Sequence, residues 1–532
     1  MAGDNAGSRL TAPRGPIGKL GPKPNRRPAL AHILQLSLAA VMIAGALGSI
    51  AEMLRDCWNP SELDYGEGIV LWQARHILDP AVTYRDVSTP PYNVTHYPPL
   101  YHLATRAVET MTHNWLVAGR LVSVVSGLGI VLAIGAVVFG VLPRRVSRAD
   151  RWTAAIFAGC SIFLHPFTTF WLRTARVDAL GLFLSFAALA IYLRWRERWG
   201  LQLAAVALFV LAGFAKQALI TIPLACLLLE VFLNWRRMLA GAAWAAGLAA
   251  IPLVAMQYRT HGGFLLNLVY YNVNPMQLAA AKSFLSSLFY SPWSLFALAV
   301  PATVITGMRL WRRRTSHPGW WRRRCEESAL LRALLLLSLH VAISLVLLPV
   351  AGAKRGASTN YYLPLLLSLS PLAGIMVWRL FAAARSSRQP AFAVLCGFSL
   401  LILACQPMLN AAPRILSPGY VDNRQTRVAE RRDLIAVVRG APGAVYSEDM
   451  VLLLQADKEV FAEPAIITVL TDAARWDERP FLDMLARQAF PLIVARDLDN
   501  RDRFTPAVAR AIRANYERGA QLDGLWVFHP RH

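Results

Sequence analysis

Two carboxylate side chains near the start of the chain have a spacing that acid–base chemistry could use. Asp64 and Glu67 lie in the motif LDYGEG, at the head of the segment GIVLWQARHIL, whose apolar spacing predicts a helix lying in the membrane interface. Three positions apart on a helix place both carboxylates on one face, from which they can take a proton from a substrate. The same spacing is typical of a helix capping box, and the two roles are compatible.

Aromatic and charged residues follow these carboxylates in the same segment. The motifs YRD and HYPPLY contain Tyr84, Arg85, His96 and Tyr97, and two consecutive prolines fix an extended backbone there. One interpretation is a stiff loop with aromatic rings at the membrane–water boundary. The other is a set of rings that stack on a sugar and cover a site. On the second interpretation, all four residues are candidates for substrate binding.

Cations interrupt the apolar sequence at three further places, in the motifs FWLRTARVDALGLF, GFAKQ and GAKRGASTNYYLPL. Ionisable groups at membrane depth are costly and tend to mark function, although long side chains also snorkel to lipid headgroups. Cations from separate segments can converge on one phosphate group. The candidates for binding a donor phosphate are Arg176, Lys216, Lys354 and Arg355, and further candidates for substrate binding are Asp178, Asn360 and Tyr361.

The elements that must position these residues are membrane-spanning helices. Of the 532 residues 55% are hydrophobic, and they gather in runs long enough to match a bilayer core, which takes about 20 residues. We expect an all-α polytopic membrane protein with about eleven spans. Residues 1–29 are predicted to be a disordered cytoplasmic tail, and residues 30–408 a transmembrane domain with a large outer loop at 55–114.

Charge sets the orientation of these spans. The formal net charge is +23, which raises the question of nucleic-acid binding, but the arginines cluster in short turns between apolar runs. We therefore interpret the charge as a topology signal and expect no nucleic-acid partner. Each segment between two Arg-rich turns must then cross the membrane twice. Residues 201–233 are too long for one span and are predicted to form two short helices with a tip near Lys216.

The C-terminal residues 409–532 alternate between strand-like and helix-like patterns. GAVYSED and PLIVARD are predicted as buried strands, PFLDMLARQAF and PAVARAIRANYERG as helices, and LDGLWVFHP as a closing strand. This pattern predicts a small extracytoplasmic α/β domain. The six cysteines form no CxxC pair, so neither a disulfide framework nor a metal site is indicated.

In order and topology these motifs resemble the GT-C superfamily, the polytopic glycosyltransferases that use lipid-phosphate sugars. The similarity is carried by LDYGEG, YRD, HYPPLY, AGRLVSVVSGLG, LRTARVDALGLFLSF, GFAKQ and GAKRGASTNYYLPL. It is greatest to bacterial mannosyltransferase-like members related to protein O-mannosyltransferases and the lipid A aminoarabinose transferase. The sequence reads DYGE where protein O-mannosyltransferases have adjacent Asp and Glu, which leaves the class of acceptor open.

The resemblance implies a GT-C-like fold and an inverting sugar transfer outside the cytoplasm. A polyprenyl-phosphate sugar would be the donor, and a glycan, lipid or protein the acceptor. In this superfamily an acidic residue of the first outer loop is the catalytic base. The resemblance implies that Asp64 has this role here, with Glu67 as the second candidate. Some members use a divalent metal, but no ligand set here demands one, and no cofactor is assigned. The resemblance also implies a multi-pass protein of a bacterial inner membrane. The Arg-rich turns and the expected eleven spans, the last at about residues 391–406, place the N-terminus in the cytoplasm and the C-terminus outside.

Two other functions fit a polytopic chain with a large outer loop. A polysaccharide ligase or polymerase would depend on Arg or His rather than on Asp64. A transporter of lipid-linked sugars would place its ionisable groups near the bilayer midplane, often in related halves. Here these groups are predicted at one surface, and the sequence has no internal repeat.

Overall fold

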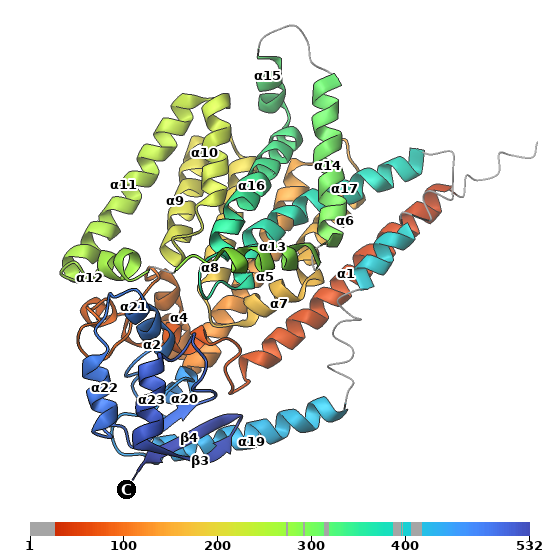
Figure 1. Ribbon diagram of the computed structural model, residues 1–532. Coiled ribbons are helices and arrows are strands. Elements are labelled where there is room, and N and C mark those ends of the chain that lie inside the picture. Colours follow the sequence, from red (N-terminus) through yellow and green to blue (C-terminus); the bar gives the residue numbers. More distant parts are fainter. Residues whose placement is uncertain are drawn as a thin grey trace, which may run out of the picture.

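The computed structural model describes residues 27–272, 275–290, 293–312, 319–386, 395, 397–405 and 418–531. Figure 1 shows a larger helical part and, at the end opposite helix α15, a smaller part that contains the sheet and the C-terminus. The predicted N-terminal tail lies outside the described residues, apart from residues 27–29, which begin the first helix.

The helical part consists of long apolar helices joined by short loops, with three short helical segments, η1 (Ser161–Leu164), η2 (Leu266–Tyr270) and η3 (Thr359–Tyr362). Its helices are α1 (Arg27–Cys57), α2 (Gly66–His76), α3 (Pro80–Thr83), α4 (Leu100–Thr112), α5 (Trp115–Val141), α6 (Arg148–Cys160), α7 (Pro166–Arg173), α8 (Asp178–Arg194), α9 (Trp199–Ala215), α10 (Thr221–Leu233), α11 (Trp235–Arg259), α12 (Gly263–Leu265), α13 (Leu278–Tyr290), α14 (Trp293–Arg312), α15 (Trp320–Glu327), α16 (Ala329–Gly352) and α17 (Leu363–Ser386).

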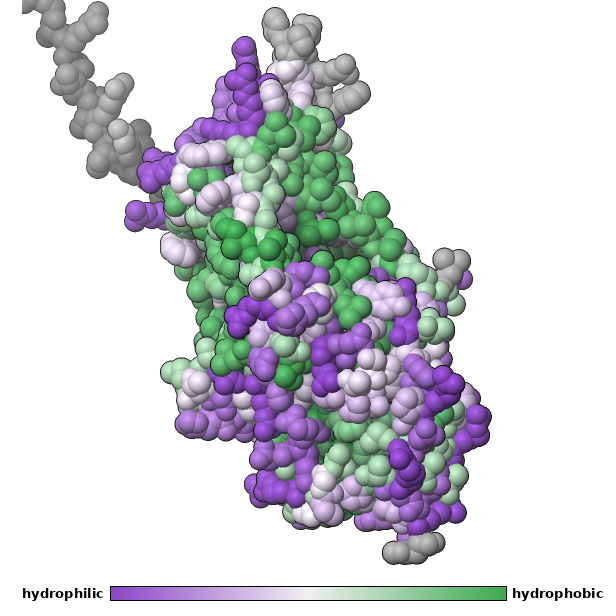
Figure 2. Space-filling model, turned by 90° about the vertical axis from the view of Figure 1, so that its left-hand side faces the viewer, coloured by the Kyte–Doolittle hydropathy of each residue, from purple (hydrophilic) through white to green (hydrophobic). Residues whose placement is uncertain are grey.

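Several of these helices have the length and composition of membrane spans. Among the described residues, five qualify singly, and two pairs bent at a short break would raise the number to seven. Figure 2 shows the corresponding surface, where hydrophobic residues cover the helical part and hydrophilic residues gather over the C-terminal part below it. The five single helices are Leu30–Cys57, Trp115–Val141, Trp235–Arg259, Ala329–Gly352 and Thr359–Arg385.

The count of eleven spans remains a prediction. The last predicted span, which begins near residue 391, lies partly outside the described residues. The predicted hairpin at residues 201–233 is present, because α9 ends at Ala215, Lys216 is its C-cap, and α10 begins at Thr221. Both helices are apolar but shorter than the spans named above.

Helix α2 is enclosed rather than placed on the membrane surface. It packs against α4 and α5 on one side and against α20 (Met450–Gln455) of the C-terminal part on the other. All of its residues from Gly66 to Ala74 are buried. No apolar face remains for lipid, so the prediction of a helix in the membrane interface is wrong.

The C-terminal part contains the predicted small sheet, with strand order β1-β2-β4-β3. Strands β1 (Tyr446–Ser447) and β2 (Ile493–Ala495) are parallel, and β4 (Leu525–Pro530) is antiparallel to β2 and to β3 (Tyr516–Leu522). The helix predicted for PAVARAIRANYERG stops at Asn515, because residues from Tyr516 pair with β4 instead. The helices around this sheet are α19 (Pro418–Gly440), α20, α21 (Pro464–Asp472), α22 (Arg479–Ala486) and α23 (Pro506–Asn515).

The two parts are joined along the first outer loop. Tyr92 forms an isolated parallel bridge with Ala462, and its ring packs within the core of the C-terminal part. At Gly68 the backbones of α2 and α20 come so close that an added Cβ atom would lie 2.5 Å from the carbonyl carbon of Met450. Only glycine permits this approach, so the second glycine of LDYGEG has a packing role.

Candidate active site

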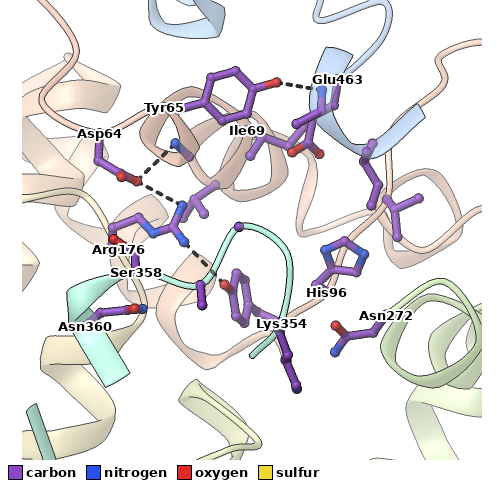
Figure 3. Close-up of a pocket in the computed structure, with 18 of the residues that line it drawn as sticks. Asp64, Tyr65, Ile69, His96, Arg176, Asn272, Lys354, Ser358, Asn360 and Glu463 are labelled. Carbon is purple, nitrogen blue, oxygen red and sulfur yellow. Dashed lines mark hydrogen bonds and ion pairs between the residues drawn. The ribbon is translucent and has the colours of Figure 1, made fainter. Parts of the chain in front are cut away.

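A cavity of about 490 Å³ lies where the loops of the helical part meet the C-terminal part (Figure 3). Its walls come from the first outer loop, from the α7–α8, α9–α10 and α16–η3 loops, and from α21 with the loop before α23. Most of the predicted site residues line it: Asp64, His96, Tyr97, Arg176, Lys216, Lys354, Arg355, Asn360 and Tyr361. The fold therefore brings together residues that the sequence places in four separate segments.

Asp64 faces this cavity from the residue before the N-cap of α2. Its Oδ2 accepts a hydrogen bond from the backbone N–H of Gly66 at 3.1 Å and pairs with Nη1 of Arg176 at 3.2 Å. The side chain is 22% exposed, so the carboxylate can be reached from the cavity. Tyr65 occupies the N-cap position of the helix, whereas a capping box would place Asp64 there.

The Arg176 guanidinium is held in one place by its surroundings. Besides the pair with Asp64, its Nη2 donates to the hydroxyl group of Tyr97 at 3.3 Å. It also occupies the space beside Gly66, where an added Cβ atom would overlap Nη1 and lie 2.6 Å from Cζ. The first glycine of LDYGEG therefore makes room for an arginine that lies more than a hundred residues further along the chain.

Glu67 is buried away from the cavity, and both of its carboxylate oxygens accept hydrogen bonds. It makes two charge-assisted hydrogen bonds with Arg120, at 2.9 and 2.7 Å, and accepts backbone N–H groups of Leu63 and Ala175, both at 2.7 Å. Neither side chain of the pair is exposed, and Arg120 lowers the pKa of the Glu67 carboxyl group against the opposing effect of burial. Asp64 faces the cavity, as predicted. The prediction that Glu67 faces the same site is wrong, because its side chain points inward to this ion pair.

Three predicted residues form a hydrogen-bonded cluster beside the cavity. Lys216 Nζ donates to Oδ1 of Asp178 at 2.5 Å, and the Asn360 amide donates to the same oxygen at 3.2 Å. Lys216 also lies over the ring of Tyr361, 5.3 Å from its centroid. Asp178 is buried and does not line the cavity, so we assign it the positioning of Lys216 and Asn360 rather than substrate contact.

Lys354 and Arg355 are adjacent in sequence but have different surroundings. Arg355 donates to Asp472 and to Asp502, the latter at 3.0 Å, and both acceptors belong to the C-terminal part. Lys354 lines the cavity, and no hydrogen bond or ion pair of its side chain occurs among the described residues. Of the two, Lys354 is thus the cation that can receive an anionic ligand, and Arg355 connects the two parts of the protein.

Of the four residues predicted in the aromatic motifs, two line the cavity and two do not. His96 and Tyr97 line the cavity, whereas Tyr84 and Arg85 do not. Tyr84 is buried and donates its hydroxyl proton to the Tyr97 carbonyl at 2.8 Å, and Arg85 donates to Thr89 at 2.6 Å. Burial lowers the pKa of His96 to about 4, so its ring is neutral at physiological pH and acts as a hydrogen-bonding group.

Several residues at or beside the cavity were not predicted from the sequence. Glu463 and Arg503 come from the C-terminal part and line the cavity, and the Arg503 guanidinium stacks on Tyr65 at 3.6 Å from the ring centroid. Arg120 is buried near the start of α5, a helix in which it is the sole charged residue. A lone charge in an apolar span is a known signal of this kind, but nothing in the sequence indicates where Glu463 lies.

The residues at the cavity do not fit a protein-held metal ion. Within the described ranges, no group of three or more His, Cys, Asp or Glu side chains could hold one. The three carboxylates that line the cavity are Asp64, Glu463 and Asp502, and they form no such group. We therefore derive no step through a metal.

The sequence matches no protein-family model and no curated protein, but its structure resembles solved structures. ArnT from Cupriavidus metallidurans in the apo state aligns over 92% of this chain and 97% of that chain, with a TM-score of 0.56 and 15% identity. The same protein bound to undecaprenyl phosphate aligns over the same shares of the two chains, with a TM-score of 0.52 and 14% identity.

A third similar structure comes from an archaeal protein. The oligosaccharyltransferase AglB from Archaeoglobus fulgidus, in complex with an inhibitory peptide and a dolichol-phosphate, aligns over 93% of this chain and 74% of that chain. Its TM-score is 0.50, and the identity is 12%. Identities this low concern the fold alone. The long apolar helices and these likenesses lead to one conclusion: the chain shares the fold of ArnT and of the oligosaccharyltransferase AglB.

Proposed function

We propose that this protein is a glycosyltransferase of the membrane that takes a sugar from a polyprenyl-phosphate donor and transfers it, with inversion, to an acceptor outside the cytoplasm. The observation that carries the proposal is the cavity, in which a reachable carboxylate, Asp64, lies beside cations from three separate loops. The solved structures with the same fold include one bound to undecaprenyl phosphate and one in complex with a dolichol-phosphate.

Asp64 is the proposed base. It takes the proton of an acceptor hydroxyl group while that oxygen forms a bond to the sugar C1 and the bond from C1 to the phosphate oxygen breaks. Attack from the side opposite the phosphate inverts C1. The hydrogen bond from Gly66 and the pair with Arg176 hold the carboxylate in one orientation, and such positioning is a large part of catalysis in general.

Arg176, Lys216 and Lys354 are the proposed ligands of the donor phosphate. Polyprenyl phosphate leaves as an anion, so cations that stabilise its charge lower the barrier and no general acid is required. Arg176 connects the proposed base with the proposed phosphate site, because its guanidinium group contacts Asp64 and also lines the cavity. Lys354, whose side chain has no hydrogen bond or ion pair among the described residues, contributes a charge that is free to meet the phosphate.

The orientation in the membrane is part of the proposal. Arg-rich turns that face the cytoplasm put the first outer loop and residues 409–532 on the outside. The cavity then lies at the outer surface, within reach of a carrier lipid whose chain stays among the apolar helices. We propose the inner membrane of a bacterium as the location.

Binding of the carrier lipid tests the phosphate site directly. Purified protein in detergent is titrated with undecaprenyl phosphate, and the variant Lys354→Met is compared with Lys282→Met. Lys282 is an exposed cation on α13 that does not line the cavity. We expect weaker binding by about tenfold or more for Lys354→Met alone, since a hydrogen bond to a charged group contributes about 1.5–3 kcal/mol. Equal affinities of both variants and the unsubstituted protein would contradict the assignment.

Transfer itself is tested in cells. Mass spectrometry of surface lipids, glycans and proteins compares a strain that lacks this gene with the same strain carrying it. We expect a sugar-sized mass difference on one class of acceptor, which would also identify the sugar. An unchanged surface in the deletion strain, under conditions where the protein is produced, would argue against the glycosyltransferase.

A further inference from the structure

Glu463 lies on the wall of the cavity that the C-terminal part provides. It is the N-cap residue of α21, and its backbone N–H donates to the Tyr92 carbonyl at 3.2 Å, so the first outer loop fixes its position. Its carboxyl group points into the cavity from the side opposite Asp64 (Figure 3). Within the part of the chain that the structure describes, no hydrogen bond or ion pair occupies this side chain.

Charged residues line both sides of the cavity. The helical part supplies the cations Arg176, Lys216 and Lys354 together with Asp64, and the C-terminal part supplies Glu463, Asp502 and Arg503. A phosphate whose lipid chain lies among the membrane helices will occupy the side with the cations. An acceptor must then approach from the other side, where the first groups that it meets belong to the C-terminal part.

We propose that Glu463 is an acceptor-binding residue, whose carboxylate accepts a hydrogen bond from a hydroxyl group of the acceptor. The subsite consists of Glu463 and Arg503, with Ile466 and Val469 as its apolar wall. It suits a polyhydroxylated ligand that presents an apolar face, as a sugar ring does. This inference rests on the proposed function and names the part of the cavity that receives the second substrate.

The surroundings of Glu463 make this subsite sensitive to pH. Burial raises the pKa of its carboxyl group to about 7, although the guanidinium groups of Arg176 and Arg503 favour the ionised form. The Tyr65 hydroxyl group is titratable as well, and its pKa is raised by burial and by the charge of Glu463. A carboxylate accepts a stronger hydrogen bond from a hydroxyl group than a neutral carboxylic acid does. Acceptor binding therefore strengthens as the pH rises through about 7.

The experiment compares pH profiles of transfer. Solubilised membranes of the deletion strain, which hold the untransferred donor and the unmodified acceptor, are mixed with purified full-length protein at pH 6 and pH 8. For the unsubstituted protein we expect about tenfold more product at pH 8, because the ionised fraction of a group with a pKa near 7 changes about tenfold between these values. Glu463→Gln retains a hydrogen-bonding amide but cannot titrate, and its profile should lose this step.

Two controls accompany this comparison. Glu517→Gln removes an exposed carboxylate on β3 that does not line the cavity, and it should keep the pH step. Glu463→Asp keeps a titrating carboxyl group but draws it back by one methylene, and it should keep the step while raising the acceptor KM. Undecaprenyl phosphate should bind to all of these variants with unchanged affinity.

The outcomes separate this inference from the proposed function. A Glu463→Gln protein with the same pH step and acceptor KM as the unsubstituted protein overturns the acceptor role and leaves the glycosyltransferase intact. An unsubstituted protein that neither binds undecaprenyl phosphate nor yields product overturns both. If Glu463→Gln fails to fold, Glu463→Asp decides, and an unchanged acceptor KM in that variant overturns the inference.

Discussion

Gly66 offers a way to move the central arginine without touching any charged residue. The position begins α2 and has no positive backbone φ, so alanine fits the local backbone and favours helix by about 1 kcal/mol. Its added Cβ atom, however, would lie 2.6 Å from Cζ of Arg176. Heavy atoms rest about 3.5 Å apart, so Gly66→Ala displaces the guanidinium by about 1 Å or more.

That displacement has a calculable effect on transfer. The Arg176 pair with Asp64 measures 3.2 Å, and its hydrogen bond to Tyr97 measures 3.3 Å, so a shift of this size breaks both. A misplacement of about 1 Å can cost about a hundredfold in rate, and the loss of one group that stabilises transition-state charge costs about 10²–10³. We expect Gly66→Ala to fold normally and to transfer sugar roughly a hundredfold more slowly.

The assay combines stability with kinetics. Thermal unfolding in detergent should give an unchanged midpoint for Gly66→Ala, and transfer is measured with solubilised membranes of the deletion strain. Gly213→Ala is the matched control, because an added Cβ atom there meets nothing within 4 Å. In an Arg176→Ala background, Gly66→Ala should have no further effect. If its loss of activity persists in that background, or if the single variant keeps full activity, the explanation is wrong.

Four other variants test the roles assigned above. Asp64→Asn keeps the size of the side chain and a hydrogen-bonding oxygen but removes the base, so transfer should fall by roughly a hundredfold or more, while undecaprenyl phosphate still binds; retained transfer would remove Asp64 from catalysis. Glu67→Gln should lose less transfer but destabilise the fold by about 3–5 kcal/mol, since it leaves the Arg120 charge buried without a full partner; an unchanged unfolding midpoint would refute this. Arg355→Ala should expose the C-terminal part to limited proteolysis, as should Asp472→Asn, and equal cleavage rates in all three proteins would show that these ion pairs do not hold it.

Much of the fold could be predicted because apolar runs indicate membrane-spanning helices and clusters of arginine indicate the turns between them. The break near Lys216 illustrates this, since a run too long for one span must bend. The start of β3 was missed because the helical spacing of residues 506–519 continues across the true boundary. The two-residue turn at Asp523 and Gly524, both with positive φ, is a recognised hairpin signal that would have corrected it.

The residues of the candidate site could be predicted only where their type stands out against the neighbouring sequence. Lys216 was found because a charge among apolar residues stands out. Glu67 was misplaced because sequence spacing indicates which residues share a helix face but not which face is covered by another part of the chain. Glu463 could not be found at all, because an acidic residue in a polar domain is ordinary until the fold turns it towards Arg176.

The cavity has a consequence for how the protein is made. The Tyr65 hydroxyl accepts the backbone N–H of Ala465, a contact that spans 400 positions of the chain. At about 5–20 residues per second of synthesis, the first outer loop waits on the order of 20–80 s before its partner exists. During that time Tyr92 and its neighbours, which later lie in the core of the C-terminal part, lack the residues that bury them. Newly made chains therefore pass through a stage in which this apolar surface has no partner, and a truncation before α21 would remove that partner altogether.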